Sequence, residues 1–312
     1  MAAIPSSAGP PLGKYLASTE KKTRDKAIKN LAVFLSDSQN AISKPEMDKL
    51  WKGIFYCFWM SDKPLVQQAL ATELAELILT ITSTSASLAF LRGFWETTVR
   101  EWNGIDRLRI DKYYMLIRRF INATFRLLAR VKWDTSACHE YNQILTKEGG
   151  PLCPSDIRVP ASLAYHIADI YVEELDKALA SPKSSSPAPL GILLGPFISL
   201  AARTPTSVTY KRIQSALFEP LFAALSPAFS QDDGPPKSKR IRLSSEAIYP
   251  EIVASSCFAD PELEGPQDGP VLKKKLLRKI FEVASEPETR DSSRRKMYAL
   301  WKENYEEVPS DE

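Results

Sequence analysis

The sequence predicts an all-α protein, a HEAT- or armadillo-like helical solenoid of antiparallel helix pairs with a C-terminal helical extension. Three observations support this class. Apolar residues recur at helical spacing, almost no stretch alternates with a period of two, and short breaks separate segments of about 15–20 residues. No repeat of fixed period accompanies the pattern, so a plain helical bundle is the alternative architecture.

The first helices have ends that the sequence marks. An amphipathic helix is expected over residues 19–35. Ser43 and Glu46 have the spacing of a capping box, with a proline in the first turn, and open a second helix. Pro64 begins a third helix, which a Ser/Thr cluster over residues 82–87 ends.

Residues 93–133 hold three of the six tryptophans and the densest run of arginines. After an Asn-Gly break, a long helix is expected over residues 106–132. Asp106 is a favourable N-cap, because its carboxylate can accept hydrogen bonds from the free N–H groups of the first turn. Arg107 and Asp111 have the i,i+4 spacing of a helical ion pair.

The long helix separates an apolar arc from a basic stripe. The stripe consists of four cations within about 40° of one another at 100° per residue: Lys112, Arg119, Arg126 and Arg130. Regularly spaced cations suit contacts with RNA phosphates or with an acidic protein. A solvated or ion-paired face is the alternative interpretation, and position alone does not choose between them.

Further helices are expected over residues 135–147, from about Pro160, and over residues 190–202 and 207–225. The last of these should kink at Pro220. Residues 181–189 are expected to form a flexible loop or short linker.

The composition changes after residue 230, where a basic cluster has the composition of a nuclear-import signal or a nucleic-acid patch: Lys237, Lys239, Arg240 and Arg242. A solvated loop is the alternative. A basic amphipathic helix follows, with cations that could meet RNA or an acidic surface: Lys273, Lys274, Lys275, Arg278 and Lys279. The last helix is expected to bury Met297, Tyr298, Leu300, Trp301 and Tyr305.

These changes divide the chain into four expected regions. They are a flexible N-terminus (1–13), a helical-repeat domain (14–229), a basic, proline-containing linker (230–270), and basic C-terminal helices that dock on the body or on a partner (271–308).

Composition and motifs exclude several classes of function. The net charge of +3 does not by itself indicate nucleic-acid binding. No signal peptide and no apolar run of 18 residues is present, so no membrane role is expected. Four scattered cysteines without a CxxC pair argue against a disulfide framework and indicate an intracellular protein.

No catalytic constellation emerges from the sequence. The Cys138-His139-Glu140 triplet lacks the second histidine of HExxH, because position 143 is Gln143. His139 and His166 are expected to be ordinary packed or surface residues. Phosphate-binding glycine motifs and a nucleophile elbow are missing as well. We therefore expect no enzyme activity, no metal, no cofactor and no small-molecule substrate.

The run FWETTVREWNGIDRLRIDKYYMLIRRF (94–120) closely resembles the signature of the ribosomal RNA-processing protein 1 family, nucleolar factors of large-subunit assembly. KYLASTEKKTRDKAIKNLAVFL, LWKGIFYCFWMSDKPLVQQALATELAELI and RRKMYALWKEN are similar to that family too, so the resemblance spans nearly the whole chain in order. It is weaker at 181–189 and around 230–270.

The resemblance implies a non-catalytic scaffold of early pre-60S particles in the nucleus and nucleolus, needed for processing the internal transcribed spacers of precursor rRNA. It implies precursor large-subunit rRNA, a WD-repeat protein and a Brix-domain protein as partners. It also implies a structural motif, in which Trp95 and Trp102 pack the core while Arg107, Arg109 and Asp111 set the helix junction. The alternative is a HEAT-type nuclear adaptor that binds a peptide or helix and has no RNA role.

Overall fold

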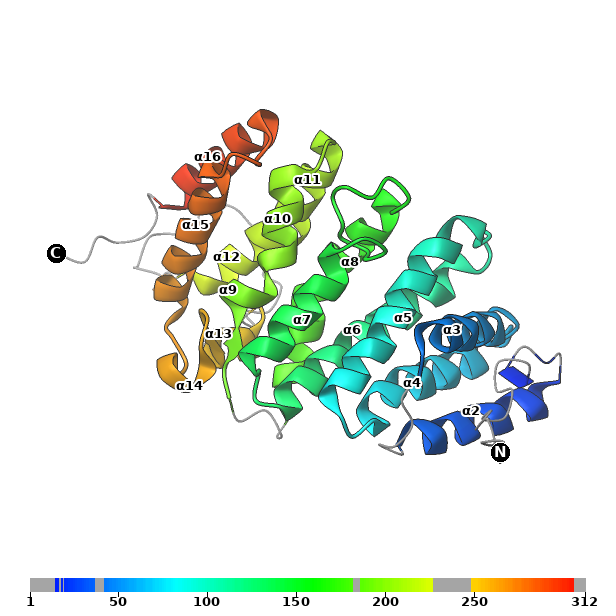
Figure 1. Ribbon diagram of the computed structural model, residues 1–312. Coiled ribbons are helices and arrows are strands. Elements are labelled where there is room, and N and C mark those ends of the chain that lie inside the picture. Colours follow the sequence, from blue (N-terminus) through cyan, green and yellow to red (C-terminus); the bar gives the residue numbers. More distant parts are fainter. Residues whose placement is uncertain are drawn as a thin grey trace, which may run out of the picture. The chain divides into compact units, whose positions relative to one another are not determined.

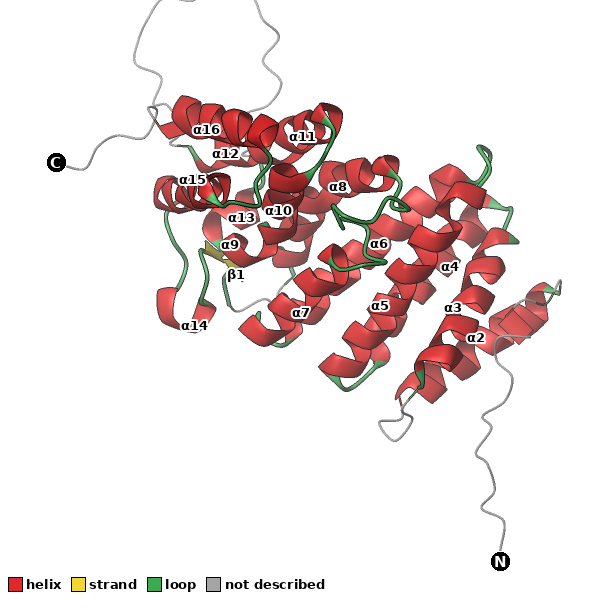
Figure 2. Ribbon diagram, turned by 45° about the horizontal axis from the view of Figure 1, so that its top comes forward, coloured by secondary structure: helices red, strands yellow, loops and turns green. Residues whose placement is uncertain are grey.

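The computed structural model describes residues 15–16, 18, 20–36, 42–181, 186–226 and 248–305, which are mostly helical (Figures 1 and 2). The chain divides into two compact units. The first comprises Met1–Leu127 and Gln143–Leu163, and the second comprises Leu128–Asn142 and Ala164–Glu312. The all-α prediction is confirmed, and consecutive helices joined by short loops are consistent with a helical solenoid.

The helices of the first unit follow the predicted breaks. They are α2 (Lys21–Ser36), α3 (Lys44–Trp59), α4 (Pro64–Thr80), α5 (Thr84–Glu101), the short 3-10 turn η1 (Trp102–Gly104), and α6 (Ile110–Arg130), whose last three residues fall in the second unit. The capping box at α3 forms, with the Glu46 carboxylate accepting from the Ser43 N–H at 3.1 Å. α3 packs against α4 and α5, and α2 packs against α4.

An aromatic core joins α3, α5 and α6. The Trp51 ring lies 4.5 Å from that of Phe90 and 5.7 Å from that of Phe120, and Phe120 stacks on Phe94 at 3.8 Å. The Trp51 Nε1 donates to the Phe90 carbonyl at 2.9 Å, so the buried indole is hydrogen-bonded. A Cβ on Gly93 would lie 2.3 Å from Trp51 Cδ1, so this close approach requires glycine. Phe90, Phe94 and Phe120 therefore pack around Trp51 in the core of the first unit.

The remaining helices are α7 (Thr135–Thr146), α8 (Ala161–Leu179), α9 (Leu190–Leu193), α10 (Gly195–Arg203), α11 (Ser207–Ile213), the π-helical turn η2 (Gln214–Phe218), α12 (Glu219–Leu225), α13 (Pro250–Ala254), α14 (Pro261–Glu264), α15 (Gly269–Ser285) and α16 (Asp291–Tyr305). In the second unit α15 packs against α10, α12 and α16. The helix expected over 190–202 is interrupted at Leu194. η2 precedes Pro220, which has no N–H for the regular ladder.

Part of the expected linker is folded. The described residues 248–270 contain α13, α14 and strand β2 (Ser256–Cys257), which pairs in parallel with β1 (Ala188–Pro189). The Ile252 side chain is fully buried, and its N–H donates to Asp176 Oδ1 at 2.9 Å. Proline and charge gave this segment a linker composition, but its few apolar residues pack into the second unit.

Candidate binding surfaces

The basic stripe of α6 begins with a buried cation. Lys112 is 6% exposed, and its Nζ donates to the Trp59 carbonyl and to the Ser61 carbonyl, both at 2.7 Å. Burial lowers the pKa of Lys112 to about 8. Lys112 therefore ties α6 to the turn between α3 and α4, and its ammonium is bound by backbone carbonyls within the first unit.

The rest of the stripe reaches the surface. Arg126 is half-buried and forms a two-point ion pair with Glu76 of α4. Arg119 and Arg130, on either side of that pair along α6, are exposed. Among the described residues, Arg119 takes part in no ion pair. Arg119 and Arg130 are thus the exposed cations of the stripe.

Two lysines of α15 hold the helix in place. Lys273 is 2% exposed, and its Nζ lies 2.9 Å from the hydroxyl of Ser226. Lys279 donates to the Gly191 carbonyl at 2.6 Å, and burial lowers the pKa of Lys279. Both ammonium groups therefore contribute to packing within the second unit.

Two of the other three cations of α15 are exposed. Lys274 and Arg278 are exposed, and Arg278 pairs with Glu282 one turn later at 2.9 Å. Lys275 is half-buried, with its Nζ 5.8 Å from the centre of the Phe258 ring. Lys274 and Arg278 are thus the α15 positions most open to a partner.

The tryptophans of the sequence motif are structural. Trp95 is 1% exposed and Trp102 is 4% exposed. The Trp102 Nε1 donates to the Ser162 hydroxyl at 3.1 Å, which ties η1 to the start of α8 within the first unit.

The helix junction is built around Asp106. Its Oδ1 accepts from the Leu108 N–H at 3.0 Å, and its Oδ2 accepts from Arg109 Nη1 at 2.5 Å. The sequence predicts that this carboxylate caps the first turn of the long helix. In the structure it accepts from a turn that precedes α6, because the helix begins only at Ile110. The Arg109 guanidinium also lies 5.0 Å from the Trp59 ring centre. Arg107 and Asp111 are exposed, and their expected pair is not among the ion pairs of the described residues.

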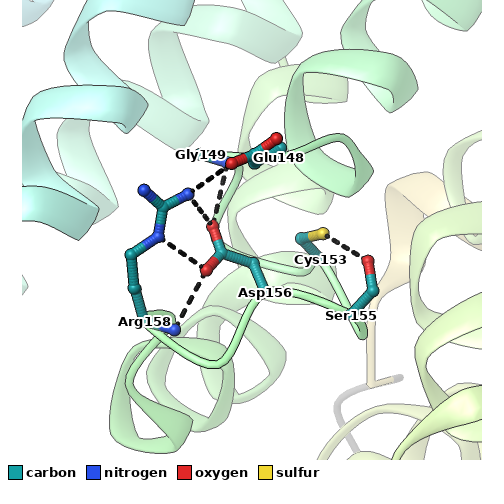
Figure 3. Close-up of polar contacts among 6 residues, drawn as sticks. All are labelled: Glu148, Gly149, Cys153, Ser155, Asp156 and Arg158. Atoms are coloured by element: carbon teal, nitrogen blue, oxygen red, sulfur yellow. Dashed lines mark hydrogen bonds and ion pairs between the residues drawn. The ribbon is translucent and has the colours of Figure 1, made fainter.

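Residues 147–160 form an ordered loop around one carboxylate (Figure 3). Asp156 accepts from the backbone N–H of Arg158 at 3.0 Å and from its Nε and Nη2, each at 2.8 Å; Gly149 N–H donates at 3.3 Å. Arg158 also reaches Glu148 at 2.8 Å. The Arg158 guanidinium lowers the pKa of Asp156 to about 2. A carboxylate so fully paired stabilises a loop and is a poor general base.

Other sequence candidates are placed as follows. His139 is exposed and His166 is half-buried. All four cysteines are buried free thiols. The import cluster at 237–242 lies outside the described residues and stays a prediction. Within the described ranges, no group of three or more His, Cys, Asp or Glu side chains could hold a metal ion. No helix of the described residues is both long and apolar enough to cross a bilayer.

The sequence predicts that Tyr298, Trp301 and Tyr305 of α16 are buried, and the structure shows that these three rings are partly exposed. Met297 and Leu300 are buried, whereas Tyr305 is 41% exposed and Tyr298 and Trp301 are half-buried. The signal was present in the sequence: the apolar residues of this helix span about 160° of its circumference, more than one contact face covers.

Comparison with known proteins gives a match over most of the chain. Residues 7–301 match a family described as nucleolar protein Nop52. The chain is 31% identical to Ribosomal RNA processing protein 1 homolog A of Homo sapiens, over 93% of this chain and 68% of that protein. It is 37% identical to homolog B of Homo sapiens over 65% of this chain, but over only 27% of that protein. A Dictyostelium discoideum homolog is 24% identical over 93% of this chain and 57% of its own length. The chain thus spans about a quarter to two thirds of these relatives.

Proposed function

Because the chain belongs to the Nop52 family of nucleolar proteins, we propose that it is a non-catalytic assembly factor of early pre-60S ribosomal particles. A nucleolar location and a role in ribosomal RNA processing follow from this membership. They agree with the resemblance drawn from residues 94–120. The single observation that carries the proposal is the family match over residues 7–301, which covers most of both compact units.

In this role the chain acts as a scaffold that contacts protein and precursor rRNA and helps processing of the internal transcribed spacers. The exposed cations Arg119 and Arg130 on α6, and Lys274 and Arg278 on α15, supply candidate phosphate contacts. Buried Lys112 and Lys273 support these helices from within. The WD-repeat and Brix-domain partners implied by the resemblance belong to this proposal, as does nuclear import through residues 237–242.

A charge-reversal experiment tests the RNA part of this scaffold. The variant Arg119→Glu/Arg130→Glu should associate less with particles that contain precursor rRNA, because two phosphate contacts become repulsive. Arg126 is left unchanged, since a glutamate there would face Glu76 and disturb the packing of α4. The matched control is Lys29→Glu/Lys52→Glu, which makes the same charge change at exposed positions of α2 and α3.

The readout is the fraction of tagged protein that sediments with precursor rRNA, with circular dichroism to verify folding. Equal particle association for the two variants would reduce the α6 stripe to a solvated face. RNase treatment distinguishes the RNA-binding scaffold from the protein adaptor. If the same amount of each protein partner co-purifies after RNA digestion, a nuclear adaptor without an RNA role is favoured.

A further inference from the structure

Four aromatic side chains form a continuous ladder across the α15–α16 hairpin. Phe281 of α15 lies 5.1 Å from Tyr298 and 4.9 Å from Trp301, measured between ring centres. Trp301 in turn stacks on Tyr305 at 4.8 Å with an interplanar angle of 27°. The Tyr298 hydroxyl is 3.0 Å from the Ser285 hydroxyl, which fixes one end of the ladder to α15.

The ladder is at the surface although its rings are large and apolar. Phe281 is 39% exposed and Tyr305 is 41% exposed, and the other two rings are half-buried. Elsewhere most aromatic rings of the described residues are in the cores. The four most exposed are Tyr15, Tyr56, Phe281 and Tyr305, so two of the four belong to this one patch. A contiguous exposed aromatic patch marks a binding surface more often than single exposed rings do.

The charge around the ladder favours a polyanionic ligand. Residues 269–305 contain ten lysines and arginines and five acidic residues, a net charge of +5, whereas the whole chain carries +3. Lys274 and Arg278 precede Phe281 by seven and three residues and share its face of α15. On α16, Arg295 and Lys302 are also exposed beside the rings. Apart from the pair between Arg278 and Glu282, these cations make no ion pair among the described residues.

We propose that this aromatic ladder binds a single-stranded RNA segment, with unpaired bases stacking on the rings of Trp301, Tyr305 and Phe281 and with phosphates held by the flanking cations. Exposed rings interspersed with cations are the combination that single-stranded nucleic acid requires, because every base offers a π face and every linkage a charge. Duplex RNA hides its base faces, so it would use the cations alone. The inference rests on the proposed function and names the form of RNA that the second unit contacts.

The test measures binding of the full chain to a fluorescein-labelled 12-nucleotide RNA of mixed sequence, alone and annealed to its complement. Trp301→Leu and Tyr305→Leu keep an apolar side chain but remove the ring. Each should weaken binding of the single strand about tenfold, with little effect on the duplex. The slope of affinity against salt should not change, because no phosphate contact is lost.

Two controls make the result specific. Lys274→Gln and Lys302→Gln should each lower the salt slope by about 0.7 while leaving stacking intact. Tyr56→Leu removes a comparably exposed ring on α3 and should leave RNA affinity unchanged. Photo-crosslinking with 4-thiouridine RNA gives a readout on the unaltered chain, and the crosslinked peptides should contain Trp301 or Tyr305.

The proposal is overturned if the ring variants bind the single strand as the wild type does, or if crosslinks fall outside α15 and α16. It is also overturned if the ring variants lose a protein partner while RNA affinity stays unchanged, because the ladder would then be a protein-docking surface. In these cases the assembly-factor proposal still stands, provided that the wild-type chain enters particles with precursor rRNA. If it enters none, the function itself fails.

Discussion

Substitution of Lys112 by methionine tests the assignment of this lysine to the core. Methionine keeps much of the apolar stem but removes the ammonium that binds two backbone carbonyls at 2.7 Å. Hydrogen bonds to a charged group contribute about 1.5–3 kcal/mol each, and removal of the buried charge offsets part of this. We therefore expect Lys112→Met to lower the free energy of unfolding by about 2 kcal/mol.

Urea unfolding, followed by circular dichroism and tryptophan fluorescence, measures this loss. With an m value of about 3 kcal/mol per M for a chain of this size, the midpoint should fall by about 0.7 M. Arg119→Met is the matched control on the same stripe and should change the free energy of unfolding by less than about 0.5 kcal/mol, since Arg119 is exposed. Equal midpoints for the two variants would refute the structural role of Lys112.

The pH dependence gives an independent check. The pKa of Lys112 is about 8 in the folded chain against 10.5 for an unperturbed lysine. Between these values the unfolded chain binds the additional proton, so the stability of the wild type relative to Lys112→Met should rise with pH from about 8 toward 10.5. A relative stability that falls across this window would show that the two carbonyls hold the ammonium more strongly than burial disfavours it.

Two further outcomes follow from the described contacts. Asp156→Asn should lower the stability of the folded chain at neutral pH. The pKa of Asp156 is lowered to about 2, so the wild type loses this stabilisation as the carboxylate is protonated. The difference in stability between the two proteins should therefore shrink as the pH falls from about 4 to about 2. Thermal midpoints of the two proteins across this pH range measure the difference, and a difference that does not change with pH would contradict the ion-pair explanation. Burial raises the pKa of the thiols of Cys57, Cys138 and Cys257 to about 11, 12 and 12. A thiol reagent at pH 8 should therefore modify these cysteines only after unfolding. Rapid labelling of the native chain would contradict their burial.

Local sequence signals predicted the helices well where the cause is local. The capping box at Ser43 and Glu46, the proline at the start of α4 and the Asn-Gly break after α5 all act over a few residues. Each of these signals coincides with a helix boundary in the structure. The family resemblance depended on the same kind of local signal, the run at 94–120.

The surface was harder to predict because burial depends on distant residues. Lys112 belongs to the stripe by helical spacing, but the turn at Trp59 and Ser61 covers it from more than 50 residues away. Lys273 is similarly covered by the chain near Ser226. Periodicity records which residues share a face, and tertiary contacts decide which part of that face reaches solvent.

The folded part of residues 248–270 was hard to predict from the sequence for a related reason. Its apolar residues are few and lack periodicity, yet Ile252 and Cys257 are fully buried. Pairing of β1 with β2 joins it to residues 188–189, about 70 positions earlier. Such long-range pairing leaves no local signature in the sequence.

The most direct test of the assembly-factor function is sedimentation of the tagged chain from nuclear extract, with sequencing of the RNA in its fractions. An assembly factor should migrate in a large particle that contains precursor rRNA of the large subunit, and RNase treatment should shift it to small complexes. Migration as a small complex without RNA would contradict the account and favour a nuclear protein adaptor.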